Sequence, residues 1–197
     1  MRFATPFLLA VITAGSTTQM ATAEALPFPG LPLDIGTEFT LTNQWGETRT
    51  QADPDGHLQL VFFGYANCDA ICTMALPQMG DIADVLAERG TQISTVMITI
   101  DGARDQPDTM AAPLADMHPR LIGLTGSSEA LEQVYDGFQI NIEHLFDDLE
   151  YGPIYAHDSS YYVLSGRGEF LTVLPPILSH ERFADILEGY AKISQDG

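Results

Sequence analysis

The chain has 197 residues, a length that suits one ordinary domain and is short for two. Hydrophobic residues make up 45% and charged residues 18%, which is typical of a globular protein and excludes a largely disordered chain. The chain contains 8 lysines and arginines and 27 aspartates and glutamates, which gives a formal net charge of −19. This charge excludes a basic surface that binds nucleic acid or anionic lipid. Two cysteines are too few for a disulfide-stapled mini-domain or for a zinc site built mainly from cysteine.

The first 23 residues have the pattern of a cleavable signal peptide. Arg2 supplies a positive charge, residues 3–14 are mostly apolar, and Ala21-Thr22-Ala23 forms an A-x-A cleavage pattern. No later apolar run reaches the length of a bilayer-spanning helix. We therefore expect residues 1–23 to be removed and the mature protein to be periplasmic, without stable membrane insertion. An uncleaved N-terminal anchor is the alternative.

The beginning of the mature chain predicts a lead-in and a hairpin. Residues 24–36 are rich in proline and glycine and predict an irregular lead-in to a single domain over 37–197. Residues 38–42 alternate like a strand, and residues 47–51 can pair back across a turn at 43–46. An N-terminal β-hairpin is therefore expected.

Strands and helices alternate after this hairpin. Residues 58–63 form an apolar run without clean alternation, which predicts a central strand buried on both faces, and residues 93–100 predict a second one. Between them, residues 73–89 have helical spacing, and Gly90 ends the helix.

The second half of the chain completes an α/β pattern. A short helix is expected over 107–117, interrupted or bent near Pro113, followed by a strand over 120–124 and a helix capped by Ser127. A strand or hairpin insert is expected within 138–156. Strands over 159–164 and 169–174 and a terminal helix capped by Ser179 complete the chain. This order is that of a thioredoxin-like fold, a three-layer α/β/α sandwich, here with an N-terminal β-hairpin extension. Periodicity by itself supports only the α/β class.

Cys68 and Cys72 lie between the first central strand and the helix that follows it. Open α/β folds place their sites at such strand ends. If the helix begins within the motif, both sulfurs lie over its first turn, where the helix dipole favours thiolate. A soft metal ion, a redox pair and a structural disulfide all remain possible. Three intervening residues, rather than the usual two of redox pairs, favour the metal.

A metal site needs a further ligand, and histidine is the best candidate. Among the five histidines, His57 looks like a surface turn residue, and His118 and His180 are expected to be exposed. His144, in the 138–156 insert, is a reserve candidate. His157 stands just before a predicted strand, at a position that approaches the cysteine loop from the side in a thioredoxin-like sheet.

Together these segments resemble the Sco/SenC copper-chaperone family over most of the domain. The matching segments are the opening hairpin at 39–46, Phe62-Phe63-Gly64-Tyr65 leading into the C-x3-C metal loop, Asp101 with Arg104 and Asp105 as an Asp-x-x-Arg-Asp segment, the Gly-Leu-Thr-Gly turn at 123–126, and His157 with Ser159. The chain departs from the family at Asp69, Ala70 and Thr73, where Pro, Asp and Pro are usual. The missing prolines imply a more flexible loop.

The resemblance implies a metallochaperone that binds one copper ion, Cu(I) or Cu(II), through Cys68, Cys72 and His157. It would support assembly of the copper A centre of cytochrome c oxidase, by delivering copper or by keeping target thiols reduced. The implied partner is the copper-accepting apo-subunit of the oxidase or another periplasmic copper protein. Such a protein is a binding protein rather than an enzyme.

The main alternative is a periplasmic thiol-disulfide oxidoreductase that uses the Cys68/Cys72 pair. A peroxidase is disfavoured because the expected Pro-x-x-x-Thr-x-x-Cys pattern is absent.

Three smaller expectations concern the surroundings of the site. Asp158 either orients His157 through a hydrogen bond or is a solvated acid at a strand end. Asp101 and Arg104 are expected to form a structural ion pair beneath the site. The methionines are expected to be core residues rather than ligands, with Met74 nearest the loop; they are Met74, Met79, Met97, Met110 and Met117.

Overall fold

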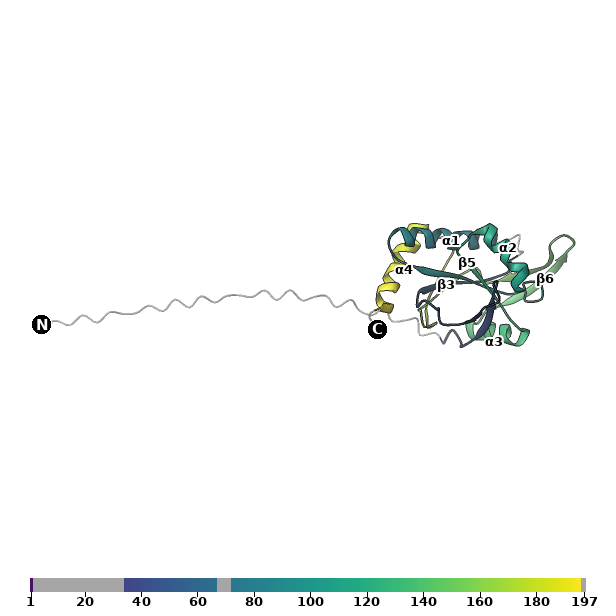
Figure 1. Cartoon of the computed structure of the whole chain (residues 1–197), viewed down its shortest axis with the longest axis horizontal. Helices are drawn as coiled ribbons and strands as arrows, with labels where there is room; N and C mark the ends of the chain where they lie inside the picture. Colours follow the sequence, from purple (N-terminus) through teal and green to yellow (C-terminus); the bar gives the residue numbers. More distant parts are fainter. Residues whose placement is uncertain (2–33, 67–71, 196–197) are drawn as a thin grey trace.

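The computed structural model describes Met1, residues 34–66 and residues 72–195, and of residues 72–73 and 193–195 it describes the backbone only (Figure 1). The predicted signal peptide after Met1, most of the predicted lead-in and Cys68 lie outside the described residues. Within the described ranges, no helix combines the length and apolarity needed to cross a bilayer.

Seven strands form one mixed sheet in the order β2-β1-β5-β4-β3-β8-β9. They are β1 (Thr40–Asn43), β2 (Thr48–Thr50), β3 (Leu58–Gly64), β4 (Ile93–Thr99), β5 (Leu121–Thr125), β8 (Tyr161–Leu164) and β9 (Phe170–Leu174). The three central strands β3, β4 and β5 run parallel, and the outer pairs are antiparallel. Every residue of β3, including Gln59, is buried, as its largely apolar sequence without clean alternation predicts.

Four helices cover this sheet: α1 (Cys72–Glu88), α2 (Pro107–Met117), α3 (Ser128–Phe138) and α4 (His180–Gln195). Helices α1, α2 and α4 lie on one side of the sheet and α3 lies on the other, so the molecule has three layers (Figure 1). The N-terminal β1–β2 hairpin pairs with β5. The predicted thioredoxin-like α/β/α fold with an N-terminal hairpin is confirmed.

The insert within 138–156 is a hairpin that stays apart from the main sheet. Its strands are β6 (Ile142–Asp148) and β7 (Gly152–His157), which pair with each other as a separate two-stranded sheet. The hairpin projects from the body beyond the end of α2 (Figure 1). Its β7 strand ends at His157, so the hairpin carries one of the predicted site residues.

The expected helix over 107–117 is present as α2, and Pro113 does not interrupt it. The expectation that His118 and His180 are exposed is wrong. His118 is not exposed, because its side chain retains 12% of its accessible surface and its Nε2 lies 3.2 Å from Oδ2 of Asp84. The space for this ring exists because Gly80 has no side chain: a Cβ there would lie 2.0 Å from the imidazole. His180 is likewise only partly exposed.

Gln44 extends the ladder between β1 and β5 through its side chain. Although it lies in the turn after β1, Gln44 is buried. Its Nε2 donates to the carbonyl of Leu121 at 2.8 Å, and its Oε1 accepts from the N–H of Gly123 at 2.9 Å. The amide therefore satisfies two backbone groups of β5, as a neighbouring strand would.

Gln44→Ala is expected to lower the free energy of unfolding by about 2–4 kcal/mol, because it leaves two buried backbone groups without partners. Urea unfolding measures the loss. The matched control is Trp45→Ala at the next position, where the side chain is 61% exposed and its truncation should have little effect. Equal losses for the two variants would contradict the structural role of the Gln44 amide.

Candidate metal centre

The cysteine segment joins the carboxyl end of β3 to the start of α1. Strand β3 ends at Gly64, and α1 begins at Cys72, so the helix begins within the C-x3-C motif, as expected. Cys68 and the side chain of Cys72 lie outside what the structure describes. The position of Cys72 at a helix N-terminus is an environment that favours thiolate over thiol.

His157 lies beside the chain that leads into this segment. Its ring makes edge contacts with Phe62 in β3, at 5.8 Å between centroids, and with Tyr65 just after β3, at 6.4 Å. Tyr65 precedes Cys68 by three residues. The structure therefore brings His157 from the distant hairpin to the carboxyl end of β3, where the cysteine segment begins.

A backbone hydrogen bond fixes the tautomer of His157. Its Nδ1 lies 2.9 Å from the carbonyl oxygen of Asp158. A carbonyl can only accept, so Nδ1 carries the proton, and in the neutral imidazole the lone pair is on Nε2. Asp158 thus orients the ring through its backbone; its carboxylate is on an exposed residue and is not the group that bonds to the ring.

Arg104 fastens the histidine-bearing hairpin to the body. The predicted ion pair is present, since Nε of Arg104 donates to Oδ2 of the buried Asp101. The same guanidinium donates to the carbonyls of Tyr151 and Pro153, the latter at 3.0 Å, and lies over the ring of Tyr65 at 5.5 Å. One side chain therefore links the loop after β4, the start of β7 and the approach to the cysteines.

Asp105 supports the base of the cysteine segment from below. Its Oδ2 accepts from the N–H of Ala66 at 2.9 Å and from the hydroxyl of Thr99 at 2.7 Å. Its Oδ1 is buried, and no hydrogen-bond partner for it lies in the described parts of the chain. Burial raises the pKa of the Asp105 carboxyl above its ordinary value, against the opposing effect of these two hydrogen bonds.

Asp105→Asn is expected to change how stability depends on pH. Because the folded state holds the Asp105 proton more tightly than the unfolded state, this group's contribution to the free energy of unfolding falls as pH rises above about 4. The variant lacks that titration. Its free energy of unfolding should therefore rise relative to that of the wild type as pH increases above about 4, and the difference should level off above the pKa of Asp105 in the folded protein. Urea unfolding across the acidic to neutral range measures it, with Asp116→Asn, an exposed acid of α2, as control. Parallel profiles for wild type and Asp105→Asn would show that the expectation is wrong.

Comparisons with known proteins decide the family. A model of the SCO1/SenC family matches residues 29–192. The chain belongs to the SCO1/SenC family. An SCO2-like protein of Rickettsia conorii is 33% identical over 138 residues, which cover 70% of this chain and 67% of that protein.

Solved structures of Sco proteins share the fold. Copper-bound ScoI of Bradyrhizobium japonicum superimposes with a TM-score of 0.70 at 25% identity, covering 79% of this chain and 99% of that one. BsSco, in which a disulfide switch was identified, is described as a member of the Sco family of cytochrome c oxidase assembly proteins. It gives a TM-score of 0.63 at 20% identity, covering 81% of this chain and 95% of that one, a likeness that shows the fold alone.

The reserve candidate of this SCO1/SenC chain lies further out on the hairpin. His144 pairs with Tyr155 in the register, two residues beyond the pair formed by Ile142 and His157. At about 3.3 Å per residue this places it about 7 Å along the strand from His157. Its Nε2 lies 3.1 Å from the Asp147 carboxylate at the surface. The structure therefore favours His157 over His144.

The five methionines from Met74 to Met117 divide into four core residues and one exposed residue. Met79, Met97 and Met110 are fully buried, and Met117 packs against the core, as expected. Met74 is 68% exposed in the first turn of α1, so its assignment to the core is wrong. Met74 lies in the first turn of α1, at the end of the helix that adjoins the loop, and there its helical spacing does not lead to burial.

A small acidic cluster is separate from this centre. One ligand atom each of Asp53, Asp55 and His57 lies within 4.8 Å of the others, but the Asp53 carboxylate already accepts from Arg49, Ser94 and two backbone N–H groups of its own turn.

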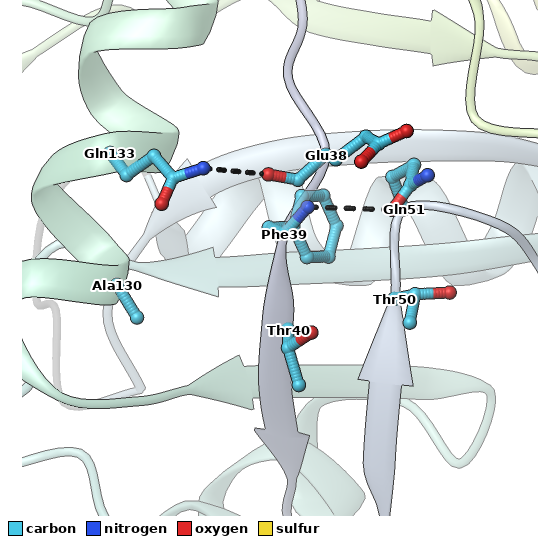
Figure 2. A pocket seen from close by; sticks show the side chains of 7 residues that line it. All are labelled: Glu38, Phe39, Thr40, Thr50, Gln51, Ala130 and Gln133. Atoms are coloured by element: carbon cyan, nitrogen blue, oxygen red, sulfur yellow. Dashed lines mark hydrogen bonds between the residues drawn. The ribbon is translucent and has the colours of Figure 1, made fainter.

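A groove on the surface is also separate from this centre. This open groove of about 550 Å³ lies between β1, β2 and α3 (Figure 2). Its lining residues are Glu38, Phe39, Thr40, Thr50, Gln51, Ala130 and Gln133. This lining holds no cysteine or histidine, and β5 and β4 separate it from β3.

Proposed function

We propose that this protein is a periplasmic copper metallochaperone that binds one copper ion through Cys68, Cys72 and His157. We propose further that it is a binding protein rather than an enzyme, and that it supports assembly of the copper A centre of cytochrome c oxidase. The observation that carries the proposal is the place of the His157 ring against Phe62 and Tyr65, beside the chain that enters the cysteine segment. The copper-bound ScoI relative and the assembly role stated for the Sco family support it.

The donor set fits copper as a cargo. Two thiolates and an imidazole are soft and borderline ligands that suit Cu(I), and an added ligand lets such a site accept Cu(II). The hydrogen bond from Nδ1 of His157 to the carbonyl of Asp158 holds the ring and leaves Nε2 as the donor atom. An incoming thiolate of the acceptor could replace one ligand at a time, so copper is transferred without being released.

Anaerobic titration of the reduced protein with Cu(I) tests the proposal. Thiolate-to-copper absorption in the ultraviolet is expected to rise linearly and to saturate at one equivalent. Cys68→Ser and Cys72→Ser should each reduce this absorption and weaken binding. Absence of the absorption at one equivalent in the wild type would overturn the proposal.

A thiol-disulfide oxidoreductase is the second candidate, and the position of Cys72 at the N-terminus of α1 favours it. In that reaction the two thiols form a disulfide while the disulfide of a target is reduced to two thiols. A wild-type protein that reduces a disulfide substrate and binds no copper would establish this function in place of the first.

A further inference from the structure

The β6–β7 hairpin concentrates exposed apolar side chains. Beyond Met1, seven large apolar residues are strongly exposed in the described ranges, and four of them belong to this hairpin. They are Leu145 at 51%, Phe146 at 54%, Leu149 at 106% and Tyr151 at 42%. A cluster of this kind on a small projecting element is the mark of an interaction surface, whereas single exposed apolar residues are common.

The register of the hairpin gives it an inner and an outer face. Tyr155 and His157, two residues apart, both lie on the inner face, where the ring of Tyr155 makes an edge contact with that of Tyr65 at 5.7 Å between centroids. A bulge between His144 and Phe146 sets Phe146 opposite Ile154, on the outer face with Ala156. The outer face therefore turns away from Tyr65 and carries an apolar strip of Phe146, Ile154 and Ala156, with Glu143 opposite Ala156 at its edge.

Acidic residues surround this strip. Residues 142–157 contain Glu143, Asp147, Asp148 and Glu150 and no lysine or arginine. The cation nearest to them in the fold, Arg104, is engaged at the base of the hairpin with Asp101 and two hairpin carbonyls. An apolar strip with an acidic rim is complementary to an apolar patch with a basic rim.

We propose that the outer face of the β6–β7 hairpin is the docking surface for the copper acceptor, a protein whose contact face combines apolar side chains with a rim of lysines or arginines. The proposal rests on the proposed function. Phe146 pairs with Ile154, three positions from His157, so Phe146 lies about 10 Å along the hairpin from the candidate ligand. A partner seated on it can reach the metal. A two-stranded hairpin offers an interface at the small end of the known range, which suits transient delivery and is less than a stable dimer needs.

Affinity for a defined probe tests the apolar part of this surface. The probe is the reduced, copper-free, soluble copper A domain of cytochrome c oxidase subunit II from the same organism. Leu145→Ser combined with Phe146→Ser should raise its Kd at least about tenfold. Ile177→Ser, which truncates an 85% exposed residue outside the hairpin, should leave the Kd unchanged. An unchanged Kd in the double variant, or an equal rise in the control, would overturn the proposal.

Salt dependence tests the acidic rim. Wild-type affinity should fall as ionic strength rises, and Glu143→Lys combined with Glu150→Lys should weaken binding and abolish that fall. Glu132→Lys, which reverses an exposed acid of α3 outside the hairpin, should leave the salt dependence in place. Two other results would refute the acceptor as the occupant: a wild-type dimer that the Leu145/Phe146 variant converts to monomers, or binding to phosphatidylcholine vesicles that this variant abolishes.

Copper binding separates the two proposals. The Leu145/Phe146 variant should still take up one equivalent of Cu(I). If the wild type binds the probe in the expected pattern but takes up no copper, the proposed function fails and the docking surface stands. If copper binds at one equivalent and the pattern of Kd values does not appear, the docking surface fails and the proposed function stands.

Discussion

His157→Ala should lower the affinity for Cu(I) by at least about 100-fold, because it removes one of the three proposed ligands, and loss of even an outer-shell partner costs 10–100-fold. The thiols should keep their reactivity, since the substitution leaves both cysteines in place. Competition between the protein and a chromophoric Cu(I) chelator measures the affinity. Titration with a thiol reagent confirms that two thiols remain.

His144→Ala is the matched control for this experiment. Both histidines lie on the same hairpin, but His144 is exposed, lies near Asp147 and contacts the ring of Tyr155, whereas His157 contacts the rings of Phe62 and Tyr65. It should therefore bind Cu(I) as the wild type does. If His157→Ala retains wild-type affinity, or if His144→Ala loses as much, the proposed ligand set is wrong.

Arg104→Ala should reduce both stability and copper affinity. It leaves the buried Asp101 carboxylate without its ion-pair partner and removes two hydrogen bonds to the hairpin, at an expected cost of about 2–4 kcal/mol in the free energy of unfolding. Copper affinity should fall because β7, which carries His157, loses its attachment to the body. Urea unfolding and Cu(I) competition measure the two effects on the same samples.

Two further variants make the Arg104 experiment specific. Arg104→Lys keeps the charge but lacks the planar fork that reaches Asp101 and both carbonyls at once, so it should rescue only part of the loss. Arg89→Ala removes an arginine that pairs with Asp185 at the surface and should have a much smaller effect on stability and none on copper. Wild-type stability in Arg104→Ala would contradict the role assigned to this side chain.

The central elements of the fold could be predicted because their sequences are constrained by burial. The run at 58–63 has no polar face because β3 lies between β4 and β8 and beneath helices. Ser127 and Ser179 cap α3 and α4, accepting from Ala130 and Arg182 as expected from their sequence positions. The hairpin at 142–157 is harder to predict, because its residues are exposed or half-buried and a bulge breaks its alternation.

The residue types of the candidate site could be predicted from the sequence, but the backbone hydrogen bonds that hold Arg104 and His157 in place could not. The role of Arg104 as a structural cation follows from its spacing to Asp101, whereas its bonds to Tyr151 and Pro153 involve backbone carbonyls some 47–49 positions away. Carbonyls are present at every residue, so sequence carries no signal for them. The same reason explains why Asp158 orients His157 through its backbone rather than its side chain.

The separate β6–β7 sheet should couple occupancy of the proposed copper site to local order. Its strands pair only with each other, and an isolated two-stranded hairpin is marginally stable, so it can open without breaking the seven-stranded sheet. A ligand held between His157 and the start of α1 binds only the closed form, so its apparent affinity scales with the closed fraction. By reciprocity, copper bound at the proposed site should slow hydrogen exchange at the hairpin amides. We therefore expect the exchange rate of residues 142–157 to report occupancy, and substitutions at the hairpin base to change affinity without altering a proposed ligand.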